Sequence, residues 1–547
     1  MNAAELLVRC LEAEGVRRIY GVPGPDTAHL QLALADSPIA FVHCRSDQAS
    51  VVMADVHGRV TGEAGVCIAS AGAAASSLLG GAQTARADGS PVVVLTGRGG
   101  RPCHGDRAPR LDALALYAPV AKWCARVARR DEVPQLVRHA FKVATAERSG
   151  PTLLELPSEV AESEASGEPL LPHRVRRPVP DAKTIDRVLQ LLRTAERPIV
   201  LAGQGVVRKG AVTQLRTLVQ ATGIAVMATL LGKGALPRDA VECLFTVPLR
   251  EKDRARGALA AADLVLCVGC AAAELNPQHW NAARDKRVVH VDVDPAEVDE
   301  HYDPEVEVVG DVAHALWMLN ERLSGSPLRF EVRDHRRIRD ELTADHCEFA
   351  DDDTEGFIRP QKAVWDARRV LGHDDILVTD VGATSHWFAG HYQCDEPLTA
   401  LTPAPCAARG FALPGAIAAK LACPERRVLA VAGDGGFVAS LPELETARRT
   451  GAHVVVMVWE DHAHGMLAWW QEERFGRRAD LVFANPDFTL LAQSFDWHGV
   501  RVERARGLQH TLEEAFQADR PTLVVVPIDY RENRRLTARY GVARGPG

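Results

Sequence analysis

The stretch VAGDGGFVASLPELE (431–445) turns an apolar run into an aspartate between glycines, and VVVMVWEDHAHGM (454–466) ends a second apolar run at another aspartate. Both runs predict buried strands. In doubly wound sheets, ligands bind at the carboxyl ends of the strands. We therefore expect Asp434 and Asp461, 27 positions apart, to meet at one edge of a parallel sheet.

The residues around these aspartates favour a bound cation and a phosphate. Gly433, Gly435 and Gly436 leave backbone N–H groups free to approach an anion, which two carboxylates alone would repel. Mg²⁺ resolves this conflict because it bridges carboxylates to phosphate oxygens. The alternative is that both aspartates only cap turns. We further expect Ser440 to be the N-cap of the next helix, with Glu443 closing a capping box.

Short apolar segments bounded by Gly or Asp alternate with helical patterns along the chain. Continuous apolar strands of this kind indicate parallel sheets that are buried on both faces. The predicted fold class is therefore α/β, with three doubly wound parallel-sheet domains. The segments are 64–70, 90–97, 197–203, 262–269, 287–293, 375–382, 427–435, 453–461 and 521–529.

Two stretches divide the chain. Residues 162–183 have no usable periodicity, and residues 324–356 are dense in charge. The first and third domains could share a topology. The predicted domains are 1–165, 180–325 and 355–530, followed by a C-terminal tail at 531–547.

Composition and charge exclude several classes of function. A net charge of −8 argues against a nucleic-acid surface. We expect no membrane association, because no apolar run approaches the roughly 20 residues that cross a bilayer. We expect no secretory signal, because the chain opens with an amphipathic helical pattern. The twelve scattered cysteines indicate a reducing, cytoplasmic location, and Cys267 and Cys270 are expected to pack in a strand rather than bind metal.

With these motifs the chain resembles thiamine-diphosphate-dependent enzymes, in their acetolactate synthase-like branch. The diphosphate-binding motif of that family pairs a GDG with Asn or Asp some tens of residues later, as GDGGF and WEDHAHGM do here. The likeness covers almost the whole chain. It includes EGVRRIYGVPG (14–24) and 54–70 in the pyrimidine-binding domain, 276–312 in the central domain, and 409–437 and PIDYRENRRLT (527–537) in the diphosphate-binding domain and tail.

By position, the resemblance implies a Mg²⁺ ion held by Asp434, Asp461 and the carbonyl of Ala463. The family binds thiamine diphosphate between two chains, so a homodimer or homotetramer with the active site at the dimer interface is implied. FAD occurs in part of the family, but no specific motif for it is present and we do not expect it. The implied cofactor-binding residues are Gly24, Val381, Ala383, Thr384, Ser385, Ala407, Arg409, Gly433, Asp434, Gly435, Gly436, Asp461, His464, Gly465 and Met466.

The catalytic position departs from the family. A family glutamate in the first domain protonates the aminopyrimidine ring of the cofactor, and the aligned residue in CRSDQAS (44–50) is Asp47. Asp47 is the predicted catalytic residue, and its side chain is shorter by one carbon–carbon bond, about 1.5 Å. This chain is expected either to have lost catalysis or to have a pocket rebuilt for another substrate.

Other family positions are altered as well. Ser77 replaces an asparagine, and Ala108 and Pro109 replace a Phe-Gln pair ahead of Asp112. Arg409 replaces the methionine that usually supports the bent cofactor, and we expect its guanidinium to recognise a substrate carboxylate or the diphosphate.

The helix after Asp461 borders the substrate pocket in the family. It carries His462, His464, Trp469 and Trp470. We expect Met466 and Trp469 to contact substrate. The alternative places the tryptophans in the core and the histidines in solvent.

The implied function is thiamine-diphosphate- and Mg²⁺-dependent decarboxylation of a pyruvate-like 2-oxo acid, with acyl transfer to an acceptor, by a transferase or lyase. One alternative is a non-catalytic member that binds the cofactor or a partner for structural reasons. Another is a nicotinamide oxidoreductase, which rests on the doubly wound pattern and on LAGQGVVRKG (201–210). The glycine spacing of that loop fits a dinucleotide motif poorly.

Overall fold

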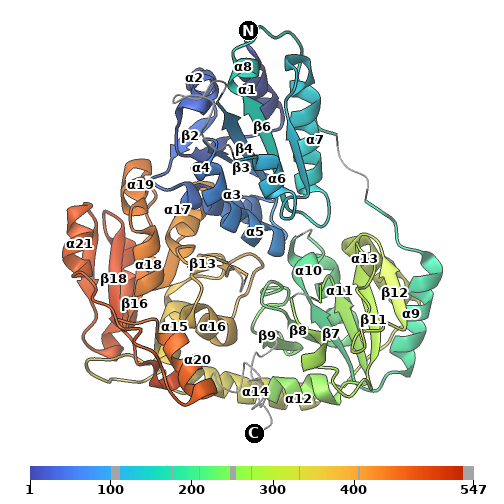
Figure 1. Ribbon diagram of the computed structural model, residues 1–547. Coiled ribbons are helices and arrows are strands. Elements are labelled where there is room, and N and C mark those ends of the chain that lie inside the picture. The colour runs from blue at the N-terminus through green and yellow to red at the C-terminus, as the bar shows by residue number, and fades with distance from the viewer. Residues whose placement is uncertain are drawn as a thin grey trace.

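The computed structural model describes residues 1–99, 111–173, 177–208, 210–246, 254–272, 274–331, 333–404 and 407–533. Within these residues the chain forms three six-stranded sheets whose paired strands are parallel. Helices alternate with the strands, which confirms the predicted α/β class with three doubly wound domains. The three sheets lie in separate parts of the ribbon in Figure 1, whereas the exact domain limits stay predictions.

Every apolar segment that predicted a strand contains one. The first sheet comprises β1 (Arg18–Gly21), β2 (Ala40–His43), β3 (Gly65–Ala69), β4 (Val92–Arg98), β5 (Trp123–Arg126) and β6 (Pro151–Pro157). The second comprises β7 (Pro198–Ala202), β8 (Ala225–Ala228), β9 (Cys243–Thr246), β10 (Leu264–Val268), β11 (Arg287–Asp292) and β12 (Val306–Val309). The third comprises β13 (Ile376–Thr379), β14 (Ala400–Leu401), β15 (Val428–Gly433), β16 (Val455–Glu460), β17 (His498–Arg501) and β18 (Thr522–Pro527).

The helices cover the faces of these sheets. Those of the first domain are α1 (Ala3–Ala13), α2 (Ala28–Ala35), α3 (Asp47–Thr61), α4 (Ala73–Ser77), α5 (Leu79–Ala87), α6 (Ala113–Tyr117), α7 (Val133–Thr145) and α8 (Ser158–Ala161). The middle of the chain contains α9 (Ala182–Thr194), α10 (Gln204–Arg208), α11 (Val212–Thr222), α12 (Arg254–Ala261), α13 (Val312–Gly325) and α14 (Arg333–Cys347). The third domain contains α15 (Pro360–Val370), α16 (Ala383–His391), α17 (Ala412–Ala422), α18 (Asp434–Ser440), α19 (Glu443–Thr450), α20 (Gly465–Phe475), α21 (Phe488–Ser494) and α22 (Leu508–Gln517).

The first and third sheets have the same strand order, which confirms the suggested shared topology. The orders are β2-β1-β3-β4-β6-β5 and β14-β13-β15-β16-β18-β17. The middle sheet differs, with the order β12-β11-β10-β7-β8-β9 that is typical of dinucleotide-binding folds. The topology of the middle domain therefore matches such folds more closely than its glycine loop does.

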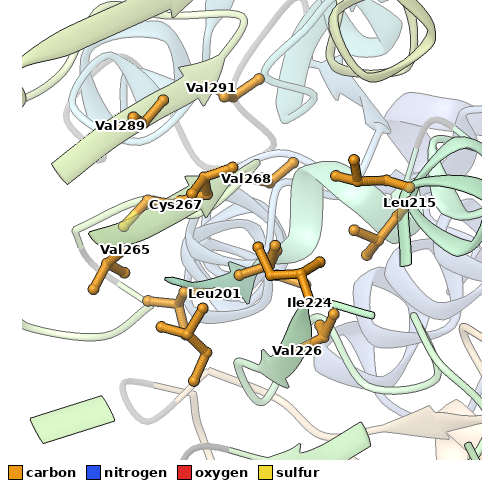
Figure 2. Close-up of a cluster of buried hydrophobic side chains, with 14 of the residues drawn as sticks. Leu201, Leu215, Ile224, Val226, Val265, Cys267, Val268, Val289 and Val291 are labelled. Carbon is orange, nitrogen blue, oxygen red and sulfur yellow. The ribbon is translucent and has the colours of Figure 1, made fainter. Parts of the chain in front are cut away.

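The strands are apolar because both faces of each sheet are covered. Figure 2 shows part of the core of the middle domain, which includes Leu201, Val265 and Val289 from the strands and Leu215 from α11. Cys267 belongs to this core, and both Cys267 and Cys270 are buried free thiols. The prediction that this CxxC pair packs in the core is confirmed.

Helices α3 and α17 bring the first and third domains together. They pack against each other within one chain, between the upper domain and the lower left domain of Figure 1. Each follows the edge strand of its own sheet, β2 or β14. The catalytic candidate Asp47 and the altered residue Arg409 stand near the starts of these two helices.

A buried ion cluster of the first domain makes hydrogen bonds to both of the other domains. Arg59 of α3 pairs with Asp55 and Asp88 and donates to the carbonyl of Thr402 at 3.2 Å. Asp88 in turn accepts the backbone N–H of Ala404 at 3.1 Å, and its carbonyl accepts the side-chain amide of Gln204 from the middle domain. A buried charge that keeps several partners is costly to disturb, so this cluster fixes the domain arrangement.

The predicted N-cap at Ser440 is wrong. The helix after the glycines, α18, begins at Asp434 and ends at Ser440, whose hydroxyl donates to the carbonyl of Phe437. Glu443 starts a separate helix and makes no capping box with Ser440. The chain turns directly from strand to helix at the glycines, so the amides of this turn lie at the sheet edge. No helix among the described residues is long and apolar enough to cross a membrane.

Candidate active site

Asp434 and Asp461 meet at the carboxyl edge of the third sheet, as predicted. β15 and β16 are adjacent parallel strands, with Gly433 opposite Trp459. The Oδ2 atom of Asp434 accepts the backbone N–H groups of Asp461 at 3.2 Å and His462 at 2.8 Å. The first carboxylate therefore holds the loop that carries the second.

A cavity of about 440 Å³ opens at this edge. Volumes of this order are usual for ligand pockets. The predicted residues that line it are Val381, Ala383, Thr384, Arg409, Gly433, Asp434, Gly435, Gly436, Asp461, Ala463, His464, Gly465 and Met466. Gly382, Leu467, Trp470 and Tyr530 complete the lining, and Gly382 falls between the predicted Val381 and Ala383.

The charges in the cavity fit a divalent cation. Burial, and then the neighbouring charge of Asp434, raise the pKa of Asp461 to about 7. A cation bound between the two carboxylates would relieve this repulsion. Within the described residues, no group of three or more His, Cys, Asp and Glu side chains is placed to hold a metal ion, so the pair needs other ligands.

The backbone of Ala463 is placed to provide one. Ala463 forms an antiparallel bridge with Val482, and the hydrogen bonds of this bridge use the N–H of His464 and the carbonyl of His462. Neither backbone group of Ala463 is used by the bridge, and its N–H is hydrogen-bonded to Asp461. Two carboxylates and a carbonyl, completed by phosphate and water oxygens, are a ligand set that suits Mg²⁺.

Glycines keep this edge open. A Cβ atom on Gly465 would lie 2.1 Å from Oδ2 of Asp461, and one on Gly436 would lie 3.0 Å from Cγ of Asp380. Gly382, at a φ of 124°, has a backbone conformation that L side chains rarely adopt. Side chains are therefore excluded from the edge, and the backbone amides can approach a diphosphate. The residues present fit thiamine diphosphate with Mg²⁺.

The structure adds Asp380, which sequence reasoning missed. This fully buried residue follows β13, and its carboxylate accepts the N–H groups of Val381 (2.8 Å), Gly410 (3.1 Å) and Ala412 (3.2 Å). Burial raises the pKa of Asp380 to about 6. Its carboxylate joins the 381–385 segment to the segment of Arg409. Its position directly after a strand, like those of Asp434 and Asp461, could have indicated it from the sequence.

Asn485 and Tyr530 were also missed. Asn485 donates from Nδ2 to Oδ2 of Asp434 at 2.8 Å, and it lies in a loop that no motif marks. Tyr530 lines the cavity beyond the end of β18, and burial together with the charges of Asp461 and Asp434 raises the pKa of its phenol. Asn485 therefore restrains the first carboxylate, while Tyr530 forms part of the wall beside both.

Asp47 lies beside the cavity segment without lining the cavity itself. It is the first residue of α3, and its buried Oδ1 has no hydrogen-bond partner within the described part of the chain. Burial raises the pKa of its carboxyl. The next residue, Gln48, donates to the carbonyl of Arg409 at 3.2 Å. A single chain thus brings the start of α3 to the segment that lines the cavity.

Arg409 points its guanidinium toward a histidine of the cavity. Its Nη1 lies 3.1 Å from Nδ1 of His464, and both residues line the pocket. The exposed arginine therefore carries a positive charge into the cavity. Whether it recognises a substrate carboxylate or the diphosphate stays a prediction.

Several predicted residues lie outside the lining. Ser385 donates to the carbonyl of Gly382, and Ala407 lies two residues before Arg409. Gly24 lies next to Ser70, whose Oγ occupies the space that a Cβ would take.

Trp469, for which we predicted a substrate contact, does not line the cavity. Trp469 packs against the core of the third domain, and Leu467 and Trp470 line the cavity instead. One residue on a helix turns a side chain by about 100°, which separates the two tryptophans.

Of the remaining departures from the family pattern and the nearby Asp112, those within the described residues do not line the cavity. Ala108 and Pro109 lie outside the described residues. The hydroxyl of Ser77 donates to the carbonyl of Ala73 at 2.9 Å, within the short helix α4. Asp112 caps α6 by accepting an N–H two residues later. These contacts are local and leave the effect of the substitutions on the pocket as a prediction.

Comparisons with known proteins agree with this geometry. Residues 1–115 match the family described as "Thiamine pyrophosphate enzyme, N-terminal TPP binding domain". Residues 185–319 match its central domain, and residues 380–526 match its C-terminal TPP binding domain.

Relatives match over nearly the full chain. A probable acetolactate synthase large subunit of Methanocaldococcus jannaschii is 32% identical over 97% of this chain and 93% of its own length. The catabolic acetolactate synthase of Raoultella terrigena is 31% identical, over 98% and 96%. The acetolactate synthase of Bacillus subtilis is 30% identical, over 98% and 95%. The chain is an enzyme that belongs to the thiamine pyrophosphate enzyme family, in its acetolactate synthase-like branch.

Proposed function

We propose that this enzyme decarboxylates a pyruvate-like 2-oxo acid and transfers the acyl group to a carbonyl acceptor, as a transferase. The observation that carries the proposal is the cavity at the edge of the third sheet. It combines an open glycine turn with Asp434 and Asp461, in a chain whose relatives named acetolactate synthase match it end to end.

Residues of this chain would have distinct roles toward the cofactor. When bound, thiamine diphosphate supplies a thiazolium carbon that adds to the 2-oxo group and accepts the electrons of decarboxylation. Asp434, Asp461 and the carbonyl of Ala463 would hold Mg²⁺ against the diphosphate, and the amides of Gly435 and Gly436 would approach its oxygens.

Asp47 would hold a proton next to the aminopyrimidine ring. Its carboxyl lies in a partly buried place that raises its pKa, which favours the protonated form needed for donation. Arg409 would orient the substrate carboxylate through a forked hydrogen-bonded contact. Met466 and Trp470 would provide the apolar wall that excludes water.

The proposal includes Mg²⁺ as the metal, a homodimer or homotetramer, and a cytoplasmic location.

A nicotinamide or flavin cofactor is not part of the proposal. The glycine loop of the middle domain uses its amide within the chain, because the N–H of Gln204 donates to Oε2 of Glu274 at 3.0 Å. The hydroxyl of Thr229 donates to the same oxygen at 2.7 Å. These contacts support leaving a dinucleotide out of the proposal, because dinucleotide folds use the amides of this first strand–helix turn to bind the pyrophosphate.

A non-catalytic role is the second candidate. The shortened Asp47 and the positively charged Arg409 favour it, since both replace residues that the family places close to the cofactor. In that case the cofactor would stabilise the fold without being turned over.

A two-stage experiment tests the proposal. Thermal denaturation with thiamine diphosphate plus Mg²⁺, with NAD, with FAD, or with none should show stabilisation by the first addition alone. The matched control is Asp434→Ala, which should show no such stabilisation. Mass spectrometry should then detect condensation products from a panel of 2-oxo acids. Binding without any product would favour the non-catalytic role, and no binding would refute both.

A further inference from the structure

The start of α3, where Asp47 stands, has no cap of its own. Ser46 occupies the N-cap position, yet its side chain makes no capping hydrogen bond. Backbone N–H groups at a helix start need acceptors when they are shielded from water. The acceptor for this segment comes from the third domain, almost 400 residues away along the chain.

Glu443 is that acceptor. Its Oε1 and Oε2 lie 3.1 and 3.3 Å from the backbone nitrogen of Arg45, and it also accepts the N–H of Ser46. Its carboxylate is held in turn by the hydroxyl of Thr446, which donates to Oε2 at 2.6 Å. Glu443 is completely buried, so each of these hydrogen bonds forms away from water.

A second residue of α19 also hydrogen-bonds to the chain just before Asp47. The guanidinium of Arg449 donates to the carbonyl of His43, at the end of β2. Glu443 in the first turn of α19 and Arg449 in its last turn therefore both hydrogen-bond to the backbone of the segment 43–46. Asp47 follows this segment directly.

Helix α19 is itself firmly placed in the third domain. The indole of Trp497, which is buried, donates to the carbonyl of Leu444 at 3.0 Å. Only Leu441 and Pro442 separate α19 from α18, the helix that begins at Asp434. Two consecutive helices, α18 and α19, thus connect Asp434, the proposed metal ligand, to Glu443, which hydrogen-bonds to the segment before Asp47.

We infer that Glu443 is a positioning residue that sets the place of the Asp47 carboxyl through the backbone of Arg45 and Ser46. The inference rests on the proposed function, in which Asp47 donates a proton to the cofactor. Because Asp47 is about 1.5 Å shorter than a glutamate, its reach depends on where the backbone stands. A misplacement of order 1 Å at a reacting centre costs on the order of 100-fold in rate.

Glu443→Gln tests the inference, with Glu514→Gln as the matched control. Glutamine keeps the volume but replaces one acceptor oxygen by an NH₂ group that cannot accept the amide hydrogens. Glu514 lies on α22 of the same domain, and its exposed side chain pairs with His510 one turn earlier on that helix. The control therefore repeats the chemical change without touching the segment 43–46.

The first measurement uses the protein without cofactor. Hydrogen–deuterium exchange followed by mass spectrometry should show faster exchange of the amides at 45 and 46 in Glu443→Gln, by about tenfold or more, and no change there in the control. Unchanged amide exchange in Glu443→Gln would overturn the assignment of Glu443 as the acceptor of these two N–H groups.

The second measurement uses protein loaded with thiamine diphosphate and Mg²⁺. Proton exchange at C2 of the bound cofactor, read by NMR in quenched samples, should slow by about tenfold or more, while the cofactor dissociation constant stays within about twofold. Equal loss of affinity and exchange would mean that Glu443 serves the fold of the pocket, and unchanged exchange would mean that it does not position Asp47. Either result overturns the inference.

Two further outcomes are kept separate. If wild-type protein binds no thiamine diphosphate, the proposed function fails and the positioning role falls with it, whatever the amide exchange shows. If Glu443→Gln does not fold, Thr446→Val replaces it, since that change removes one hydrogen bond to Glu443 and keeps the side-chain volume. Slower C2 exchange at unchanged affinity would then support the inference, and wild-type exchange would overturn it.

Discussion

Substituting Gly465 by alanine should separate cofactor binding from folding. Gly465 is the first residue of α20, and a Cβ atom there would lie 2.1 Å from Oδ2 of Asp461 and 2.9 Å from Cδ2 of Tyr530. Ordinary contacts of a Cβ atom begin at 3.4 Å, so the carboxylate oxygen must retreat by about 1.3 Å, the difference between these distances.

The size of this movement decides the effect on the metal. Mg²⁺ demands near-octahedral ligands at about 2.0–2.1 Å, and a ligand displaced by more than a few tenths of an ångström no longer coordinates it. We expect apparent Mg²⁺ affinity in the presence of thiamine diphosphate to fall by about 100-fold. The fold should survive, because alanine is favoured over glycine in a helix by up to about 1 kcal/mol.

Calorimetric titration of Mg²⁺ into protein with saturating thiamine diphosphate measures the effect. The control is Gly507→Ala, where an added Cβ meets no atom within 4 Å and φ is −77°. Thermal denaturation without ligands should give similar midpoints for both variants. If Gly465→Ala bound Mg²⁺ as tightly as the control, Asp461 would not be a metal ligand in the geometry described above.

Three other changes test the site and the fold. Arg409→Met should raise the Michaelis constant for the donor acid by about tenfold or more with little effect on cofactor affinity, and equal steady-state kinetics would return the residue to a structural role. Asp47→Ala should slow C2 proton exchange below the rates of both wild type and Asp47→Glu, and exchange as fast as wild type would remove Asp47 from the mechanism. Burial, then the charges of Arg18 and Arg17, lower the pKa of His57 to about 4 from an ordinary value near 6.5. Between these pH values the unfolded chain binds more protons, so stability falls as the pH drops from 6.5 to 4. His57→Gln should therefore lose less thermal stability than wild type between pH 7 and pH 5, and parallel losses would contradict the shift.

The local pattern of the chain was enough to predict the strands. Strand segments such as 427–435 and 453–461 are apolar throughout because both faces of a parallel sheet are buried, and that constraint acts on each segment separately. The same reasoning placed Asp434 beside Asp461, because the carboxyl ends of neighbouring parallel strands share one edge. Glycines at that edge indicated an anion for a similar reason.

Predictions that depended on short-range geometry were less successful. The cap at Ser440 was wrong because the chain enters α18 at Asp434 without a polar capping side chain, using the glycine turn instead. The exchange of Trp469 for Trp470 in the cavity follows from one step of helix rotation. The Ser440 error misses a whole helix of seven residues, whereas the tryptophan difference is a shift of one position within α20.

The amino-acid sequence by itself determined the three α/β domains, the carboxylate pair and the family, because periodicity and motif spacing are properties of short stretches. Tertiary structure alone decided that Asp380 joins two cavity segments, that Asn485 reaches Asp434, and that Glu443 accepts the backbone N–H groups just before the helix of Asp47. Each of these contacts links residues distant in the chain, and a buried carboxylate or amide acquires its partners only when the domains pack. No local pattern records which distant amide a buried glutamate will meet.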